Sequence, residues 1–330
     1  MRLAWIWSVL LTVVLSVPAA AQDIPHYGEA KAAASAGRVD EALALYQKGA
    51  EACRQAGDPL GEALCHYEMG ALYYDRQELT RALEFLDRAL PVFEKHQVAM
   101  AVEMILYRSG LARAALEQYP EAVRDLSRAL ESARGRQEST RERQIMVQLG
   151  RVRWEAGDYP EALHTSEEAA RLCAAAGDPV GQAEALRWAG YSNWNLGLPD
   201  EAERCLRKAA DLLTGAGQAE AARELVAEAD RYPREMAEAI RLLEEKLAAG
   251  GQPHERGVWF YRAGTAYLYL KKPAEAERCF RQAADMFLQA GSVREAALAR
   301  ASLGKAALEQ GRPQPAAEAL EAALAVLPPG

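Results

Sequence analysis

Small apolar residues recur along this chain at a fixed interval of forty residues, with polar turn residues between them. Residues 150–169, which read GRVRWEAGDYPEALHTSEEA, form the middle of one such unit. Three series share the spacing: Gly70, Gly110, Gly150 and Gly190; Ala82, Ala122, Ala162 and Ala202; Ala89, Ala129, Ala169 and Ala209. The pattern resumes later, at Gly264, Ala276 and Ala283 and again at Gly304, Ala316 and Ala323. Such self-similarity is typical of a stacked repeat protein, so we expect a series of helix–turn–helix units.

The recurring small residues predict close contact between paired helices. A side chain without bulk allows two helix axes to approach, whereas a large one at the same place would force them apart. Glycine inside a helix costs about 1 kcal/mol relative to alanine. Because six units carry a glycine at the same phase, we expect a packing requirement at each of them.

This pattern resembles the tetratricopeptide repeat family, in which glycine stands at position 8, alanine at positions 20 and 27 and often proline at position 32. The period here is 40 residues rather than 34, which is similar to family members with longer helices. The resemblance covers about residues 23–328 and implies an all-α solenoid, a right-handed superhelix of about eight helix pairs. Because the motif residues are packing residues, the resemblance implies little about a specific function.

We expect residues 22–330 to form one continuous array without an interdomain linker. The predicted units are about 23–58, 59–98, 99–138, 139–178, 179–217, 218–252, 253–291 and 292–328. The sequence AGDP at 56–59 and 176–179 fits a helix boundary, since glycine ends one helix, aspartate caps the next and proline suits its first turn. The sixth unit is short and has Glu224 near the expected glycine, with its turn predicted at Tyr232-Pro233.

The amino terminus has the layout of a secretory signal peptide. Arg2 precedes the apolar run LAWIWSVLLTVVLSV, and Pro18 and three alanines precede Gln22. The alternative is an uncleaved membrane anchor, although a span needs about 20 apolar residues. We therefore expect residues 1–21 to be removed and the chain to be exported, to a bacterial periplasm or beyond, with no permanent membrane span.

Charge and cysteine content change this picture only slightly. The net charge of −8 argues against a nucleic-acid partner, which would require a basic surface. Export would permit oxidation of the five cysteines. Cys53 and Cys65 flank one predicted turn and could face each other, but the odd total and the lack of a pairwise spacing pattern favour burial of all five as small apolar residues.

No catalytic or metal-binding signature is present in the sequence. It contains no Cys-x-x-Cys pair, no His-Glu-x-x-His, no phosphate-binding loop and no calcium loop. Its five histidines are scattered along the chain and show no helical pairing. We therefore expect no metal, no cofactor and no enzymatic activity.

The resemblance implies that ligands lie in a concave groove lined by the first helix of each unit. Tyrosine, tryptophan and arginine, which dominate binding hot spots, recur at the positions expected to face this groove. The candidate ligand contacts are Tyr67, Tyr107, Arg108, Arg151, Arg187, Trp188, Tyr191, Tyr261 and Arg262. Such residues also fill the seam between neighbouring first helices, and we assign Trp154 and Trp194 to that packing role. The function expected is a scaffold that binds a protein or peptide.

The last predicted helix suggests a second kind of contact. From Pro315 it reads PAAEALEAALAVL, with Glu318 and Glu321 as its only charges. The terminal helix of a solenoid needs a polar outer face, yet Leu320, Leu324, Val326 and Leu327 have little to cover them. Either two chains associate through this helix as a homodimer, or the array resembles the amino-terminal half of a larger peptidase-like protein.

Overall fold

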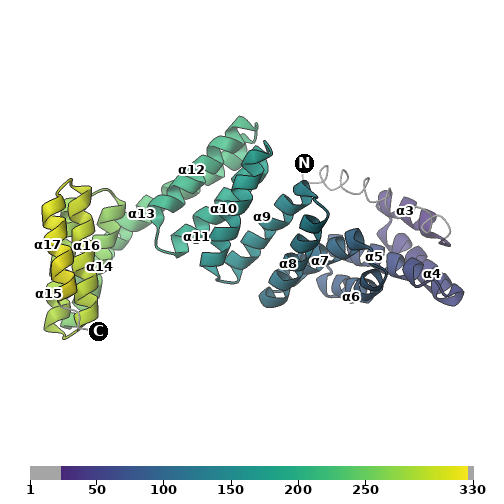
Figure 1. Ribbon diagram of the computed structural model, residues 1–330, viewed down its shortest axis with the longest axis horizontal. Coiled ribbons are helices and arrows are strands. Elements are labelled where there is room, and N and C mark those ends of the chain that lie inside the picture. Colours follow the sequence, from purple (N-terminus) through teal and green to yellow (C-terminus); the bar gives the residue numbers. More distant parts are fainter. Residues whose placement is uncertain (1–23, 326–330) are drawn as a thin grey trace. The chain divides into compact units, whose positions relative to one another are not determined.

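The computed structural model describes residues 24–325, and every regular element in that range is an α-helix (Figure 1). Two compact units divide between Ser192 and Asn193. The first contains α3 (Tyr27–Ser35), α4 (Val39–Ala56), α5 (Pro59–Asp75), α6 (Leu79–Lys95), α7 (Ala99–Ala115), α8 (Tyr119–Gly135), α9 (Ser139–Glu155) and α10 (Tyr159–Ala175). Helix α11 (Pro179–Asn195) contains the division. The second unit contains α12 (Pro199–Gly215), α13 (Ala219–Ala249), α14 (Pro253–Tyr269), α15 (Pro273–Gln289), α16 (Val293–Glu309) and α17 (Pro313–Ala325).

The forty-residue period has a simple structural origin. Each helix from α5 to α12 has 17 residues and is followed by a three-residue connection, so two helices with their connections occupy forty residues. One residue of each connection adopts a left-handed conformation, as Gly157 does with φ of 80°. The amide of Asp158 then bonds to the carbonyl of Arg153 at 3.0 Å, which satisfies an otherwise unpaired helix-end carbonyl.

Glycine accommodates a neighbouring side chain at the centre of most helix pairs. A Cβ atom on Gly70 would lie 2.8 Å from Cγ of Leu86, and one on Gly110 would lie 2.7 Å from Cγ of Leu126. Every repeat glycine is buried, at Gly70, Gly110, Gly150, Gly190, Gly264 and Gly304. The repeat alanines are at most 1% exposed, at Ala82, Ala122, Ala162, Ala202, Ala276 and Ala316. Small side chains therefore let the paired helices interdigitate.

Helix α10 departs from this arrangement because all of its buried side chains are small. At the position of Leu86 and Leu126 it has Ser166, whose Oγ is buried without a hydrogen-bond partner and lies where a Cβ on Gly150 would be. The α9–α10 pair therefore buries less apolar volume at its centre than its neighbours.

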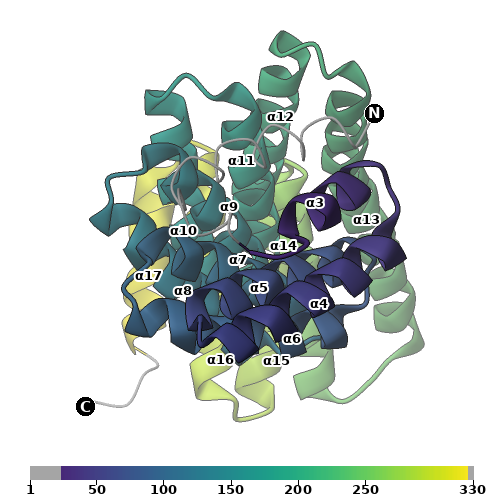
Figure 2. The ribbon, with the colours of Figure 1, turned by 90° about the vertical axis from the view of Figure 1, so that its right-hand side faces the viewer.

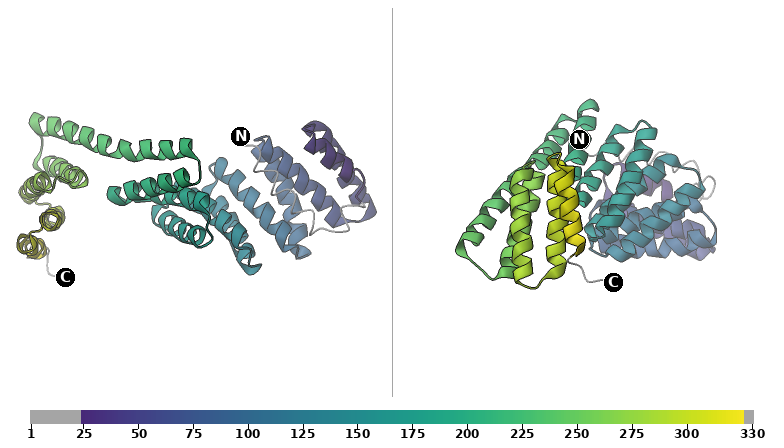
Figure 3. Two further views of the ribbon diagram at one scale, coloured as in Figure 1. Left: turned by 90° about the horizontal axis from the view of Figure 1, so that it is seen from above. Right: turned by 60° about the vertical axis from the view of Figure 1, so that its left-hand side comes forward.

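The predicted turn at Tyr232-Pro233 is wrong. Helix α13 continues through it for 31 residues with Pro233 inside, and it is the long helix of the second unit in Figure 3. No glycine precedes Pro233 to end the helix in a left-handed residue, and strong helix formers follow it. Their helical preference outweighs the single backbone donor that proline removes. The described residues thus contain seven helix pairs and one long single helix.

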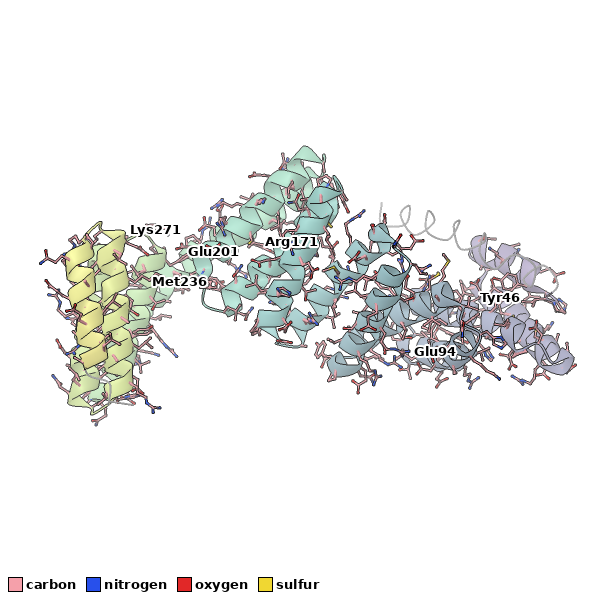
Figure 4. All side chains as sticks on the ribbon, viewed as in Figure 1. Tyr46, Glu94, Arg171, Glu201, Met236 and Lys271 are labelled. Carbon is pink, nitrogen blue, oxygen red and sulfur yellow. The ribbon has the colours of Figure 1, made fainter. Side chains whose placement is uncertain are left out.

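Each unit has its own core. In the first unit α4, α5 and α6 lie side by side (Figure 2), and Tyr46 (Figure 4) is 1% exposed with its ring 5.5 Å from that of Tyr27. In the second unit α14 to α17 pack in sequence around Phe280 and Phe287 (Figure 3).

Cys53 and Cys65 are both buried thiols in the first unit. Burial raises the pKa of Cys65 to about 12, and the nearby Cys53 adds to this effect.

Within residues 24–325 no helix is both long enough and apolar enough to span a bilayer. The predicted signal peptide, Val326 and Leu327 lie outside the described residues.

Candidate functional site

Arg108 and Tyr67 form one edge of a polar surface on the first helices of the first unit. The Nη1 atom of Arg108, on α7, donates to the hydroxyl of Tyr67 on α5, and its guanidinium lies 5.3 Å from the centre of the tyrosine ring. Tyr67 is only 7% exposed. Beside it, Tyr27 donates to Oε1 of Glu68 at 2.7 Å, and burial raises the pKa of that carboxyl despite this bond. Tyr67 therefore orients Arg108, and its own side chain has little exposed area with which to contact a ligand.

Tyr107 lies under a second arginine. The guanidinium of Arg141, on α9, is 4.9 Å from the centre of the Tyr107 ring, and its Nε donates to Oε1 of Glu103 at 2.9 Å. Arg136 donates to the other oxygen of Glu103, which is 1% exposed. The sequence analysis missed Arg141, because it lies in the first turn of α9, before the positions used to predict ligand contacts.

Arg151 is held by two side chains of its own helix, one of which bonds to α11. Its Nε donates to Gln148 at 3.0 Å and its Nη1 to Glu155 at 2.8 Å, while Gln148 donates to Glu184 of α11 at 3.3 Å. Burial raises the pKa of the Tyr107 phenol, and the charges of Arg141, Arg151 and Glu184 all act on it. Side chains from three helices are therefore close enough to interact electrostatically.

An aromatic cluster joins α9 to α11. The ring centres of Trp154, Trp188 and Tyr191 lie 5.4 to 5.6 Å apart. Trp188 is 9% exposed, and the indole nitrogens of Trp154 and Trp188 are buried without hydrogen-bond partners. This packing explains why Trp188 presents little surface to a ligand, in contrast to its predicted role.

Arg187 lies on the exposed side of this cluster. Its guanidinium is 5.1 Å from the centre of the Trp188 ring and 4.0 Å from Glu184, and its side chain is 38% exposed. The Arg151 side chain is 26% exposed. We call Tyr67, Tyr107, Arg108, Arg151 and Arg187, together with Trp188, Glu155 and Glu184 that contact these arginines, the first-helix surface. Arginines held by aromatic rings and acids in this way are preorganised for carboxylates and carbonyl oxygens.

Tyr261 and Arg262 lie in the second unit, on α14. Tyr261 accepts a hydrogen bond from Ser302 at 3.3 Å, and its ring is 5.5 Å from that of Phe280. Arg262 is exposed. The structure thus groups seven of the nine predicted contacts in the first unit and two in the second.

The part of the chain that the structure describes contains no cluster of potential metal ligands. No three His, Cys, Asp or Glu side chains there are arranged so that they could hold a metal ion. The acids of the first-helix surface are instead engaged by Gln148 and by arginines, as Glu184 and Glu155 are.

Comparison with known proteins supports the repeat architecture. A family model described as "Tetratricopeptide repeat" matches residues 25–95, 102–175 and 255–328, which is more than half of the chain. No protein of curated function matches the sequence.

Solved structures of low sequence identity are similar to this chain, and the first two described here have TM-scores of at least 0.50. The apo form of RapI is 12% identical, covers 91% of this chain and 96% of its own, and has a TM-score of 0.53. Aspartyl phosphate phosphatase F from Bacillus subtilis is 14% identical over 91% of this chain and 70% of its own, with a TM-score of 0.50. A signal transduction ATPase with numerous domains and a tetratricopeptide repeat sensor, from Pyrococcus horikoshii, is 14% identical over 91% of this chain, with a TM-score of 0.47. This chain spans only 41% of the length of that ATPase.

Proposed function

Because this chain belongs to the tetratricopeptide repeat family, we propose that it is a non-enzymatic scaffold that binds an extended segment of a protein partner on the first-helix surface. The observation that carries this proposal is the arginine series of α7, α9 and α11. Arg108, Arg151 and Arg187 are each held in place by a ring or an acid of the same surface. Preorganised arginines lose little side-chain entropy when they bind the carbonyl and carboxylate oxygens of a peptide.

A peptide-binding experiment tests this function. The chain from Gln22 onward is used to select from a phage-displayed library of random peptides, and the affinities of the recovered peptides are measured by fluorescence anisotropy. We expect Arg151→Glu combined with Arg187→Glu to weaken binding at least roughly tenfold, the effect of about 1.4 kcal/mol. Trp188 is left intact because removal of a side chain that is only 9% exposed would damage the core.

Arg171→Glu is the matched control. Arg171 is an exposed arginine of the first unit that lies on α10, a second helix (Figure 4). It should bind the peptides as the parent chain does, with an unchanged circular-dichroism spectrum. Equal affinities for the double variant and the parent chain would exclude the first-helix surface as the binding site.

We also propose that the chain acts outside the cytoplasm of a bacterium. The support is the order of Arg2, the apolar run and the alanines before Gln22. Amino-terminal sequencing of the protein from a periplasmic fraction should begin at or near Gln22. A protein that keeps residues 1–21 and stays in the cytoplasm would contradict export.

A second copy of the chain is a further proposed partner. Leu320 is 43% exposed and Leu324 is 71% exposed on α17, and apolar side chains with this exposure favour association. Light scattering of the chain with and without residues 313–330 tests whether the last helix mediates it.

A further inference from the structure

Arg108 differs from the other arginines of the first-helix surface because no acid pairs with it. Arg151 and Arg187 each lie within 4.0 Å of a carboxylate on their own helix. Arg108 is half-buried on α7, and its hydrogen bond goes to the neutral hydroxyl of Tyr67. Among residues 24–325 it forms no ion pair. Because a half-buried cation is normally paired, Arg108 is the arginine that gains most from a negative charge on a partner.

The two acids that act on Arg108 electrostatically do not form ion pairs with it. Burial raises the pKa of both Glu68 and Asp75, despite the opposing effect of the arginine. Glu68 accepts a hydrogen bond from Tyr27 at 2.7 Å, and Asp75 is exposed at the end of α5. A guanidinium has five N–H donors, so Arg108 retains donors for a ligand.

Two tyrosines beside Arg108 add further donors. Tyr74, on α5, and Tyr107, on α7, are both half-buried. The charges of Arg108 and Arg151 act on the Tyr74 phenol, and that of Arg151 also acts on the Tyr107 phenol. Neither hydroxyl bonds to another residue in the range 24–325. Guanidinium N–H and phenol O–H groups are thus close together, and a carboxylate accepts hydrogen bonds from both.

We propose that the partner segment carries an aspartate or glutamate whose side-chain carboxylate binds Arg108. This inference rests on the proposed scaffold function and specifies the chemistry of the partner. A side chain fits better than a chain end, because protein surface continues on both sides of α7, at Tyr74 on α5 and at Arg151 on α9. A singly charged group fits better than a phosphate, because Glu68 and Asp75 would repel a second negative charge.

Double-mutant cycles test the contact. The peptides recovered from the random library are synthesised with each aspartate or glutamate in turn replaced by asparagine or glutamine, and fluorescence anisotropy measures their affinities. At one acidic position the replacement should weaken binding to the chain from Gln22 onward at least roughly tenfold, which is about 1.4 kcal/mol. In Arg108→Gln the same replacement should change the affinity less than about twofold, because the carboxylate then has no partner to lose.

Two other arginine variants act as controls. Arg108→Lys keeps the charge, so the peptide replacement should still weaken binding in that variant. Arg151→Gln is the matched control, because Arg151 is half-buried on the neighbouring first helix and already pairs with Glu155. The peptide replacement should weaken binding as much in Arg151→Gln as in the parent chain. Coupling of the acidic position to Arg151 in place of Arg108 would overturn the inference.

Asp75→Asn should act in the opposite direction. It removes a negative charge that acts on Arg108, so acidic peptides should bind roughly two- to fivefold more tightly. The peptides with a neutralised acidic position should bind this variant as they bind the parent chain. Weaker binding of the acidic peptides to Asp75→Asn would contradict the proposed position of the carboxylate.

A second selection needs no variant of the chain. A library of the same design, made without codons for aspartate and glutamate, should yield no peptide within roughly tenfold of the best acidic one. Equal affinities from the two libraries would overturn this inference and leave the scaffold function standing, whereas a lack of binders in both would refute the two together. Amidation of the peptide carboxyl end should leave the affinity unchanged, and a tenfold loss would show that a terminal carboxylate, not a side chain, binds the surface.

Discussion

Replacing glycine by alanine should have opposite effects in two neighbouring helix pairs. At Gly110 a new Cβ would lie 2.7 Å from Cγ and 3.1 Å from Cδ2 of Leu126, and 3.2 Å from the backbone oxygen of Ala122. The Cγ atom carries both methyl groups of the leucine, so it cannot move without moving the whole side chain. At Gly150 the Cβ would meet only the hydroxyl oxygen of Ser166, whose remaining atoms are no closer than 3.5 Å.

The magnitudes follow from two opposing effects. Alanine gains about 1 kcal/mol over glycine in a helix at either position. Overpacking a well-filled contact costs about 1–3 kcal/mol, so Gly110→Ala should lower the free energy of unfolding by up to about 2 kcal/mol. Ser166 can rotate away, and its Oγ has no hydrogen bond to lose. Gly150→Ala should therefore raise the free energy of unfolding by about 0.5–1 kcal/mol.

Native-state hydrogen exchange measures both changes where they occur, because a repeat array can open one unit at a time. Protection in α7 and α8 should fall in Gly110→Ala, and protection in α9 and α10 should rise in Gly150→Ala. Gly135→Ala is the reference for helix propensity alone, since a Cβ there meets nothing within 4 Å. In the Leu126→Ser background the cost of Gly110→Ala should largely disappear. Equal protection in the two single variants would refute this explanation of the repeat glycines.

Two further predictions concern stability. Burial holds the pKa of Glu68 above its ordinary value of 4.5 in the folded protein, so as pH rises above that value the unfolded state ionises first and stability falls until the folded carboxyl has also ionised. Glu68→Gln, which can still accept from Tyr27, should raise the melting temperature at pH 7 and remove this decline, and a parent-like pH profile in the variant would contradict the assignment. Gln137 adopts φ of 57° and Gly157 φ of 80° at equivalent connections, so Gln137→Gly should stabilise and Gly157→Ala should destabilise, each by about 1 kcal/mol. Urea denaturation measures both, and shifts of the same sign would be inconsistent with the left-handed connections.

Turn chemistry explains how far local sequence reasoning could go. Glycine at 57, 157 and 177 marks helix ends in the sequence and adopts a left-handed conformation in the structure. Gln77 and Glu117 adopt the same conformation at equivalent steps without any such mark. The repeat spacing, and not the residue type, identifies those two ends. Where that spacing was interrupted, at Pro233, the predicted turn was wrong, because a proline alone does not end a helix that strong helix formers continue.

The sequence by itself determined the all-α repeat architecture. Small residues at a forty-residue interval and helix-ending residues act locally, so their effect is visible as a repeating pattern in the sequence. Only the tertiary structure decided which first-helix side chains remain available. Tyr67 and Trp188 hold Arg108 and Arg187 in place and are themselves largely buried. Arg141 packs on the ring of Tyr107, from a position that the repeat pattern does not identify. The physical reason is that exposure at these positions depends on the size and charge of side chains forty residues away, on the neighbouring repeat, and no single repeat contains that information.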